Sequence, residues 1–234
     1  MHASNHHGDV SAVARWQSAA VGVVVYSAAI AAVWCWRRGV IVAPDQAAWL
    51  VPLTWIVAAL LPTRLLSPPS RDLFSRAQWI GEPHVTVRAL LIASLIILPL
   101  FSLVYLFYYG WWRGAPIAPS LPDRWGGMAL FQFLYVGFPE ELFFRGYLQQ
   151  RFDDAFGRPH RCCRAAWGPG LPLANLFFAT GHLVVTGDVR RLAVFFPGLV
   201  FGWLQARTDA LLAPMLFHGM CNITLLTLQA WTVP

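Results

Sequence analysis

The chain has 234 residues, of which 57% are hydrophobic and 12% are charged, and its formal net charge is +6. Soluble domains usually carry about 25% charged residues, so the composition excludes an ordinary water-facing surface. Every basic residue is Arg. Because these arginines lie between apolar runs and not in a patch with exposed aromatic residues, they indicate membrane topology and contact with anionic lipid, and not a nucleic-acid partner.

Apolar segments recur along the whole chain. A spanning helix needs roughly 20 apolar residues. The predicted fold class is therefore all-α, a polytopic helical membrane protein with about seven to eight transmembrane helices. The first segment is too long for a signal-peptide core and ends in Arg37-Arg38, so we expect a retained helix. The predicted spans are 14–36, 47–66, 85–112, 125–151, 170–187, 192–206 and 210–231.

The chain divides into two predicted regions. Residues 1–124 are expected to form N-terminal transmembrane helices and basic loops. Residues 125–234 hold nearly all the polar groups that fall at membrane depth. Any chemistry is therefore expected in this second, helical core.

The first polar constellation is Pro139-Glu140-Glu141-Leu142-Phe143-Phe144-Arg145. We expect Pro139 to interrupt its helix, so that a half-helix begins near Glu140 and its free N–H groups favour a carboxylate. Glu141 and Arg145, four residues apart, are predicted to form an ion pair. Glu140 points about 100° away from them and stays free to act. The alternative is that these charges reach water at the membrane interface, but adjacent acids amid Phe and Leu are costly unless paired or functional.

Two further constellations lie on later apolar segments. One is Asn175-Leu176-Phe177-Phe178-Ala179-Thr180-Gly181-His182, and the other is Phe217-His218-Gly219-Met220-Cys221-Asn222. His218 and Asn222 are four residues apart and share one face of the last helix. Taken singly, each constellation is more often a hydrogen-bonded contact between helices than a catalytic site.

Together the three constellations meet the needs of water activation. Glu140, helped by His182, can take a proton from water. His218 and Asn222 can hold the oxyanion of a tetrahedral intermediate. The sequence has no G-x-S-x-G nucleophile motif and no H-E-x-x-H zinc motif. Cys221 is expected to rotate away from the Asn222 face, which argues against a Cys–His protease.

The cysteines indicate no disulfide framework. Cys162 and Cys163 are adjacent in one loop, with His160 nearby. This is a weak metal pattern, because zinc needs four ligands at workable spacing. An Arg-rich loop is the favoured interpretation.

The order and spacing of Glu140-Glu141-x-x-x-Arg145, Phe178-x-x-x-His182 and His218-x-x-x-Asn222 resemble the CPBP family. This family comprises CAAX proteases and bacteriocin-processing enzymes and includes the type II CAAX prenyl endopeptidases. The resemblance covers about residues 125–226 and implies an intramembrane endopeptidase, with a helical fold and a conical cavity open to the membrane. In the roles it implies, Glu140 and His182 activate water, His218 and Asn222 form the oxyanion hole, and Glu141 and Arg145 are supporting residues.

The glutamate mechanism proposed for that family needs no metal, so we expect no cofactor. The alternative is zinc, with Glu140, His182 and His218 as ligands and water in the fourth position.

We therefore predict hydrolysis of a peptide bond in a membrane-embedded or membrane-anchored protein or peptide, such as a C-terminal anchor or sorting signal. The expected partners are this substrate and the lipid bilayer, without nucleic acid. The Lys-free, Arg-rich composition indicates a GC-rich bacterial genome and hence a multi-pass protein of the bacterial inner membrane. One alternative is a non-catalytic bacteriocin-immunity or scaffold membrane protein of the same fold. Another is a small transporter, since a broken helix with carboxylates at membrane depth also suits ion coupling.

Overall fold

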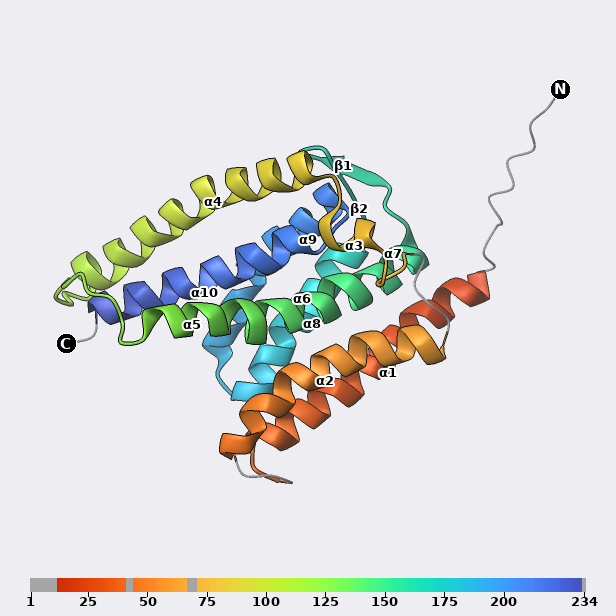
Figure 1. Ribbon diagram of the computed structural model, residues 1–234, viewed down its shortest axis with the longest axis horizontal. Helices are drawn as coiled ribbons and strands as arrows, with labels where there is room; N and C mark the ends of the chain where they lie inside the picture. Colours follow the sequence, from red (N-terminus) through yellow and green to blue (C-terminus); the bar gives the residue numbers. More distant parts are fainter. Residues whose placement is uncertain (1–11, 41–43, 67–70, 233–234) are drawn as a thin grey trace.

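The computed structural model describes residues 12–40, 44–66 and 71–232. It is about 80% helical, and its helical elements join into seven long rods, which confirms the predicted all-α class (Figure 1). Six of these rods are α1 (Ala12–Arg37), α2 (Pro44–Leu65), α4 (Pro83–Leu106) with its π-helical continuation η1 (Phe107–Trp112), α8 (Gly170–Thr186), α9 (Phe195–Thr208) and α10 (Leu212–Thr232). The short helix α3 (Arg76–Ile80) and the 3₁₀ helix η4 (Val189–Val194) lie between rods.

The seventh rod is built from five consecutive elements. They are α5 (Trp125–Phe131), the π-helix η2 (Gln132–Gly137), α6 (Phe138–Glu141), the π-helix η3 (Leu142–Leu148) and α7 (Gln149–Phe156). This central rod runs past the expected end at residue 151 because α7 is a polar continuation that stops only at Gly157, whose φ is +72°. Such a positive φ is accessible to glycine without a steric penalty.

The expected helix break at Pro139 is wrong. Gly137, just before α6, has φ −61° and ψ −46°, so the backbone stays helical through the proline. Proline lacks an N–H and its ring crowds the preceding turn of an α-helix. The wider turns of η2 and η3 on either side of α6 accommodate both defects. No half-helix therefore begins near Glu140, and the broken helix that favoured an ion-coupled transporter is not found in this rod.

Three helical runs among the described residues are long and apolar enough to cross a membrane, namely Arg15–Arg37, Ala48–Leu65 and Arg76–Trp112. α8 is apolar but shorter. Large apolar side chains on these runs face outward; Leu95 of α4, for example, is 73% exposed. Such a surface is stable against lipid tails and not against water. The chain is therefore an integral membrane protein.

The central rod lies in the middle of the molecule, surrounded by the others (Figure 1). α10 packs against η2, α2 against η3, and α1 and α8 against α7. As a result, every residue from 141 to 152 is buried. The core is therefore centred on the segment that carries the first polar constellation.

A small β-hairpin joins α7 to α8, where the sequence had predicted only an Arg-rich loop. β1 (His160–Cys162) pairs antiparallel with β2 (Ala165–Trp167). Cys163 and Arg164 form its tip with φ of +49° and +65°, the backbone that a two-residue hairpin turn requires. Cys162 and Cys163 are both exposed, free thiols.

Candidate active site

Two glycines bring the central rod against α10. A Cβ at Gly137 would lie 2.9 Å from the backbone oxygen of Met215, and a Cβ at Gly219 would overlap the ring of Phe133. Such contacts are possible only without side chains. The polar residues of η2 and α6 therefore lie within reach of those on α10.

Glu141 and Arg145 form the predicted ion pair inside this contact region. Arg145 Nε lies 3.2 Å from Glu141 Oε2, and the side chains are 1% and 0% exposed. The guanidinium also donates to the backbone oxygen of Gly198 at 2.9 Å and to Asn175 Oδ1 at 3.4 Å. It lies over the ring of Phe178, 4.6 Å from the ring centroid. Pairing and hydrogen bonding offset the cost of burying these charges, and they join the central rod to α8 and α9.

Glu141 has a second partner that the sequence did not reveal. His218 Nδ1 lies 2.8 Å from Glu141 Oε1, with the imidazole buried. Because a carboxylate paired with arginine is an acceptor, Nδ1 must donate the proton. The ring also stacks on Phe201, with centroids 4.7 Å apart. His218 is thus held in one orientation, with Nε2 directed towards Glu140.

His182 is held by its own helix. Its Nδ1 lies 2.9 Å from the backbone oxygen of Phe178, one turn earlier in α8. A carbonyl oxygen only accepts, so Nδ1 carries a proton, and in the neutral ring Nε2 then presents its lone pair. The Phe-x-x-x-His spacing therefore determines which nitrogen of His182 is available.

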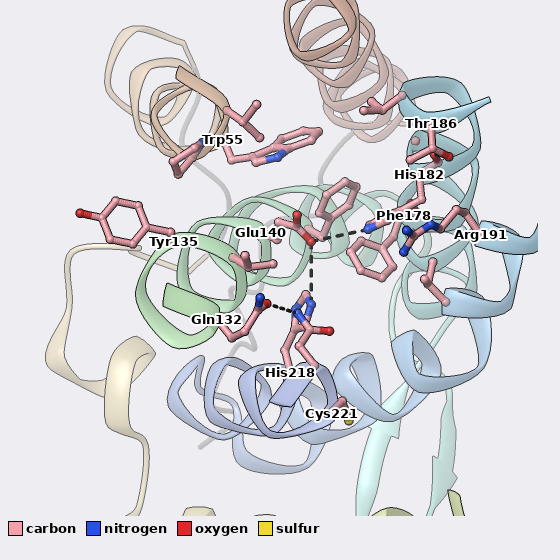
Figure 2. Close-up of a pocket in the computed structure, with 18 of the residues that line it drawn as sticks. Trp55, Gln132, Tyr135, Glu140, Phe178, His182, Thr186, Arg191, His218 and Cys221 are labelled. Atoms are coloured by element: carbon pink, nitrogen blue, oxygen red, sulfur yellow. Dashed lines mark hydrogen bonds and ion pairs between the residues drawn. The ribbon is translucent and has the colours of Figure 1, made fainter. Parts of the chain in front are cut away.

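Both imidazoles converge on Glu140 (Figure 2). Its Oε2 lies 4.0 Å from His182 Nε2 and 3.9 Å from His218 Nε2. This oxygen is buried and makes no hydrogen bond within the described part of the chain. A buried carboxylate oxygen that makes no hydrogen bond to the protein is available to a bound water or a reacting group.

Asn222 is the fourth predicted site residue. Its Nδ2 donates to Oε1 of Gln132 at 2.9 Å. Gln132, on η2, was not among the predicted site residues, because no motif spacing distinguishes it in the sequence. Only the packing of η2 on α10 brings the two amides together.

These residues line a cavity of about 490 Å³. Ligand pockets commonly range from about 300 to 1,000 Å³. Glu140, His182, His218 and Asn222 all border it. Helices of the first region contribute as well, including Val33 and Arg37 of α1 and Val51, Pro52 and Trp55 of α2.

The position of Cys221 differs from the one predicted from the sequence. It borders the same cavity instead of pointing away from it. Its thiol is free, and no hydrogen bond joins it to His182 or His218 in the described part of the structure. A Cys–His dyad is therefore not formed in this structure.

The spacing of Glu140, His182 and His218 bears on the zinc alternative. Two ligands of a tetrahedral zinc ion lie about 3.4 Å apart, whereas Glu140 Oε2 is 3.9 and 4.0 Å from the two imidazole nitrogens. Across residues 12–40, 44–66 and 71–232, no group of three His, Cys, Asp or Glu side chains is arranged to hold a metal ion. The arrangement of Glu140, His182 and His218 does not fit zinc as it stands.

Comparison with known proteins supports the resemblance. Residues 123–224 match the family model described as type II CAAX prenyl endopeptidase Rce1-like. No curated protein and no solved structure matches the chain. The matched segment begins just before α5, ends within α10 and contains all three polar constellations. Residues 123–224, a little under half of the chain, are therefore similar to the Rce1-like type II CAAX prenyl endopeptidases.

Proposed function

We propose that the protein is a glutamate-dependent intramembrane endopeptidase that hydrolyses a peptide bond with an activated water. The observation that carries the proposal is the convergence, inside the cavity, of His182 Nε2 and His218 Nε2 on Oε2 of Glu140, an oxygen that makes no hydrogen bond to the described residues. The match of residues 123–224 to the Rce1-like family model supports a membrane protease of the CAAX type.

The distances suit a bound water. A water about 2.8 Å from two polar atoms bridges a gap of roughly 4 Å when the angle at the water is near 90°. Glu140 takes the proton from this water, with His182 Nε2 as a second acceptor, and the hydroxide oxygen adds to the scissile carbonyl carbon. The C–N bond then breaks, and the proton held by Glu140 passes to the leaving amine.

His218 and Asn222 are proposed to stabilise the oxyanion. Since Nδ1 of His218 donates to Glu141, its Nε2 donates only when the ring is protonated. The cluster is then electrically neutral, because the charges of Glu140 and Glu141 balance those of Arg145 and the imidazolium.

The proposed substrate is a membrane-associated protein or peptide, such as a C-terminal anchor or sorting signal, in the bacterial inner membrane. The lining of the cavity by apolar residues of α1 and α2 supports an apolar substrate segment. We propose that no metal takes part, consistent with the ligand spacing given above.

The test compares cells that express the wild type, Glu140→Gln or His182→Ala. New N-termini in the membrane fraction are identified by mass spectrometry. Glu140→Gln keeps the side-chain volume but removes the base, so cleavage should fall by about 10²-fold or more. Glu82→Gln is the matched control, because the Glu82 side chain is 75% exposed and does not line the cavity.

Unchanged cleavage in both Glu140→Gln and His182→Ala would overturn the proposal. The competing immunity or scaffold function predicts a wild-type phenotype from a strain carrying Glu140→Ala, since such a role needs no general base.

A further inference from the structure

The amide of Asn222 has two N–H groups, and among residues 12–40, 44–66 and 71–232 only one of them finds an acceptor. One donates to Gln132 Oε1 at 2.9 Å. Both side chains border the cavity, so the second N–H stays available for a group bound there. An asparagine side chain without such a partner rotates about its last bond, because that torsion is broad.

Gln132 is brought to Asn222 by the way η2 packs on α10. It is the first residue of η2, and α-helical hydrogen bonding gives way to the wider π turn at this point. π-Helical turns are frequent at functional sites. Gly219, between His218 and Asn222 on α10, leaves space for Phe133, the neighbour of Gln132. The two amides are therefore held together by packing on both sides.

We infer that Gln132 is a positioning residue, which fixes the amide of Asn222 so that its free N–H is aimed at the oxyanion. This inference rests on the proposed function, since an oxyanion forms only if the protein is a hydrolase. An oxyanion donor contributes to rate only when it is held in place before the charge develops. Gln132 itself does not contact the reacting atoms in this assignment.

The first experiment observes the amide directly and needs no substrate. The chain has three asparagines, Asn5, Asn175 and Asn222, so asparagine labelled with ¹⁵N in its side chain gives three pairs of amide signals. Gln132→Met keeps the shape of the side chain but removes the acceptor. It should shift the Asn222 signals and speed their exchange with solvent, while the Asn175 signals stay in place and report an intact fold. Asn222 signals identical to those of the wild type would overturn the inference.

The second experiment measures kinetics on a quenched peptide that spans the cleavage site mapped in the membrane fraction. Gln132→Met should lower kcat by about 10-fold, a part of the 10²–10³-fold that loss of an oxyanion donor costs, with KM unchanged. Gln132→Glu retains an acceptor oxygen and should restore most of kcat. Gln17→Met, on an exposed part of α1, is the matched control.

A double-mutant cycle separates this inference from the proposed function. If Gln132 acts through Asn222, the variant with both Gln132→Met and Asn222→Ala should be no slower than Asn222→Ala alone. Additive losses would show that Gln132 acts independently, and full kcat in Gln132→Met beside a slow Asn222→Ala would overturn this inference alone. Full activity in both Asn222→Ala and Glu140→Gln would instead overturn the proposed function.

Discussion

His218 Nδ1 lies 2.8 Å from Glu141 Oε1, so one buried carboxylate holds both an imidazole and the guanidinium of Arg145. Glu141 therefore does more than form an ion pair with Arg145. It orients the histidine that faces Glu140 and at the same time ties the central rod to α8 and α9 through Arg145.

Removing the Glu141 carboxylate should damage both stability and activity. In Glu141→Gln the buried guanidinium loses its counter-ion, which typically costs about 3–5 kcal/mol. Adding Arg145→Met to this variant removes the unpaired charge and should recover part of the melting temperature, but His218 still lacks its carboxylate, so cleavage stays low. Thermal unfolding in detergent and peptide cleavage measure the two effects. Recovery of cleavage in the double variant would mean that Glu141 acts only through Arg145.

A side chain at Gly219 should separate η2 from α10. Its Cβ would overlap Phe133, and overpacking of this kind typically costs about 1–3 kcal/mol. Gly219→Ala should therefore lower the melting temperature and reduce cleavage, since Gln132 and Asn222 would move apart. Gly126→Ala is the control, because a Cβ at Gly126 meets no atom within 4 Å. Equal behaviour of the two variants would contradict this account of the packing.

Asp153 should make stability depend on pH. It lies beyond the expected membrane span, which ends at residue 151, and burial raises its pKa from 3.8 to about 7, although Arg158 and Arg71 lower it. Between about pH 4 and pH 7 the folded state therefore holds a proton that the unfolded state has released. Stability from this group is fully present below pH 4 and is lost as the pH rises through 7.

The variant Asp153→Asn tests this dependence. It cannot ionise, so its melting temperature relative to the wild type should rise between pH 4 and pH 7 and then stay constant. Thermal unfolding in detergent from pH 4 to pH 8 gives this difference. A difference that does not change with pH would show that the folded and unfolded states bind the proton at Asp153 equally.

Chelation should leave cleavage unchanged. The Glu140–imidazole distances exceed the spacing of zinc ligands, so the proposed mechanism uses the carboxylate and the imidazoles without a metal. Cleavage is measured with and without 1,10-phenanthroline, and the metal content of the purified protein is determined by elemental analysis. Loss of cleavage on chelation, with recovery on adding zinc, would favour the alternative in which Glu140, His182 and His218 bind the ion.

The sequence alone determined the membrane placement, the seven helical rods and the residues of the three motifs. Apolar length and 3.6-residue periodicity are local properties, so the ion pair between Glu141 and Arg145 could be predicted from their spacing. The predicted helix break at Pro139 was wrong because the effect of a proline depends on whether the neighbouring helical turns widen. Whether these turns widen depends on the packing of η2 and η3 and not on the proline itself.

Only the tertiary structure decided how the three motifs meet. The contact of His218 with Glu141 and that of Asn222 with Gln132 join residues 77 and 90 positions apart. No helical period relates such residues, and their distance depends on which faces of two rods touch. Here glycines at 137 and 219 allow the backbones to approach closely. The sequence therefore identified the candidate catalytic side chains. The close packing of the central rod on α10 determined which side chains contact and orient them.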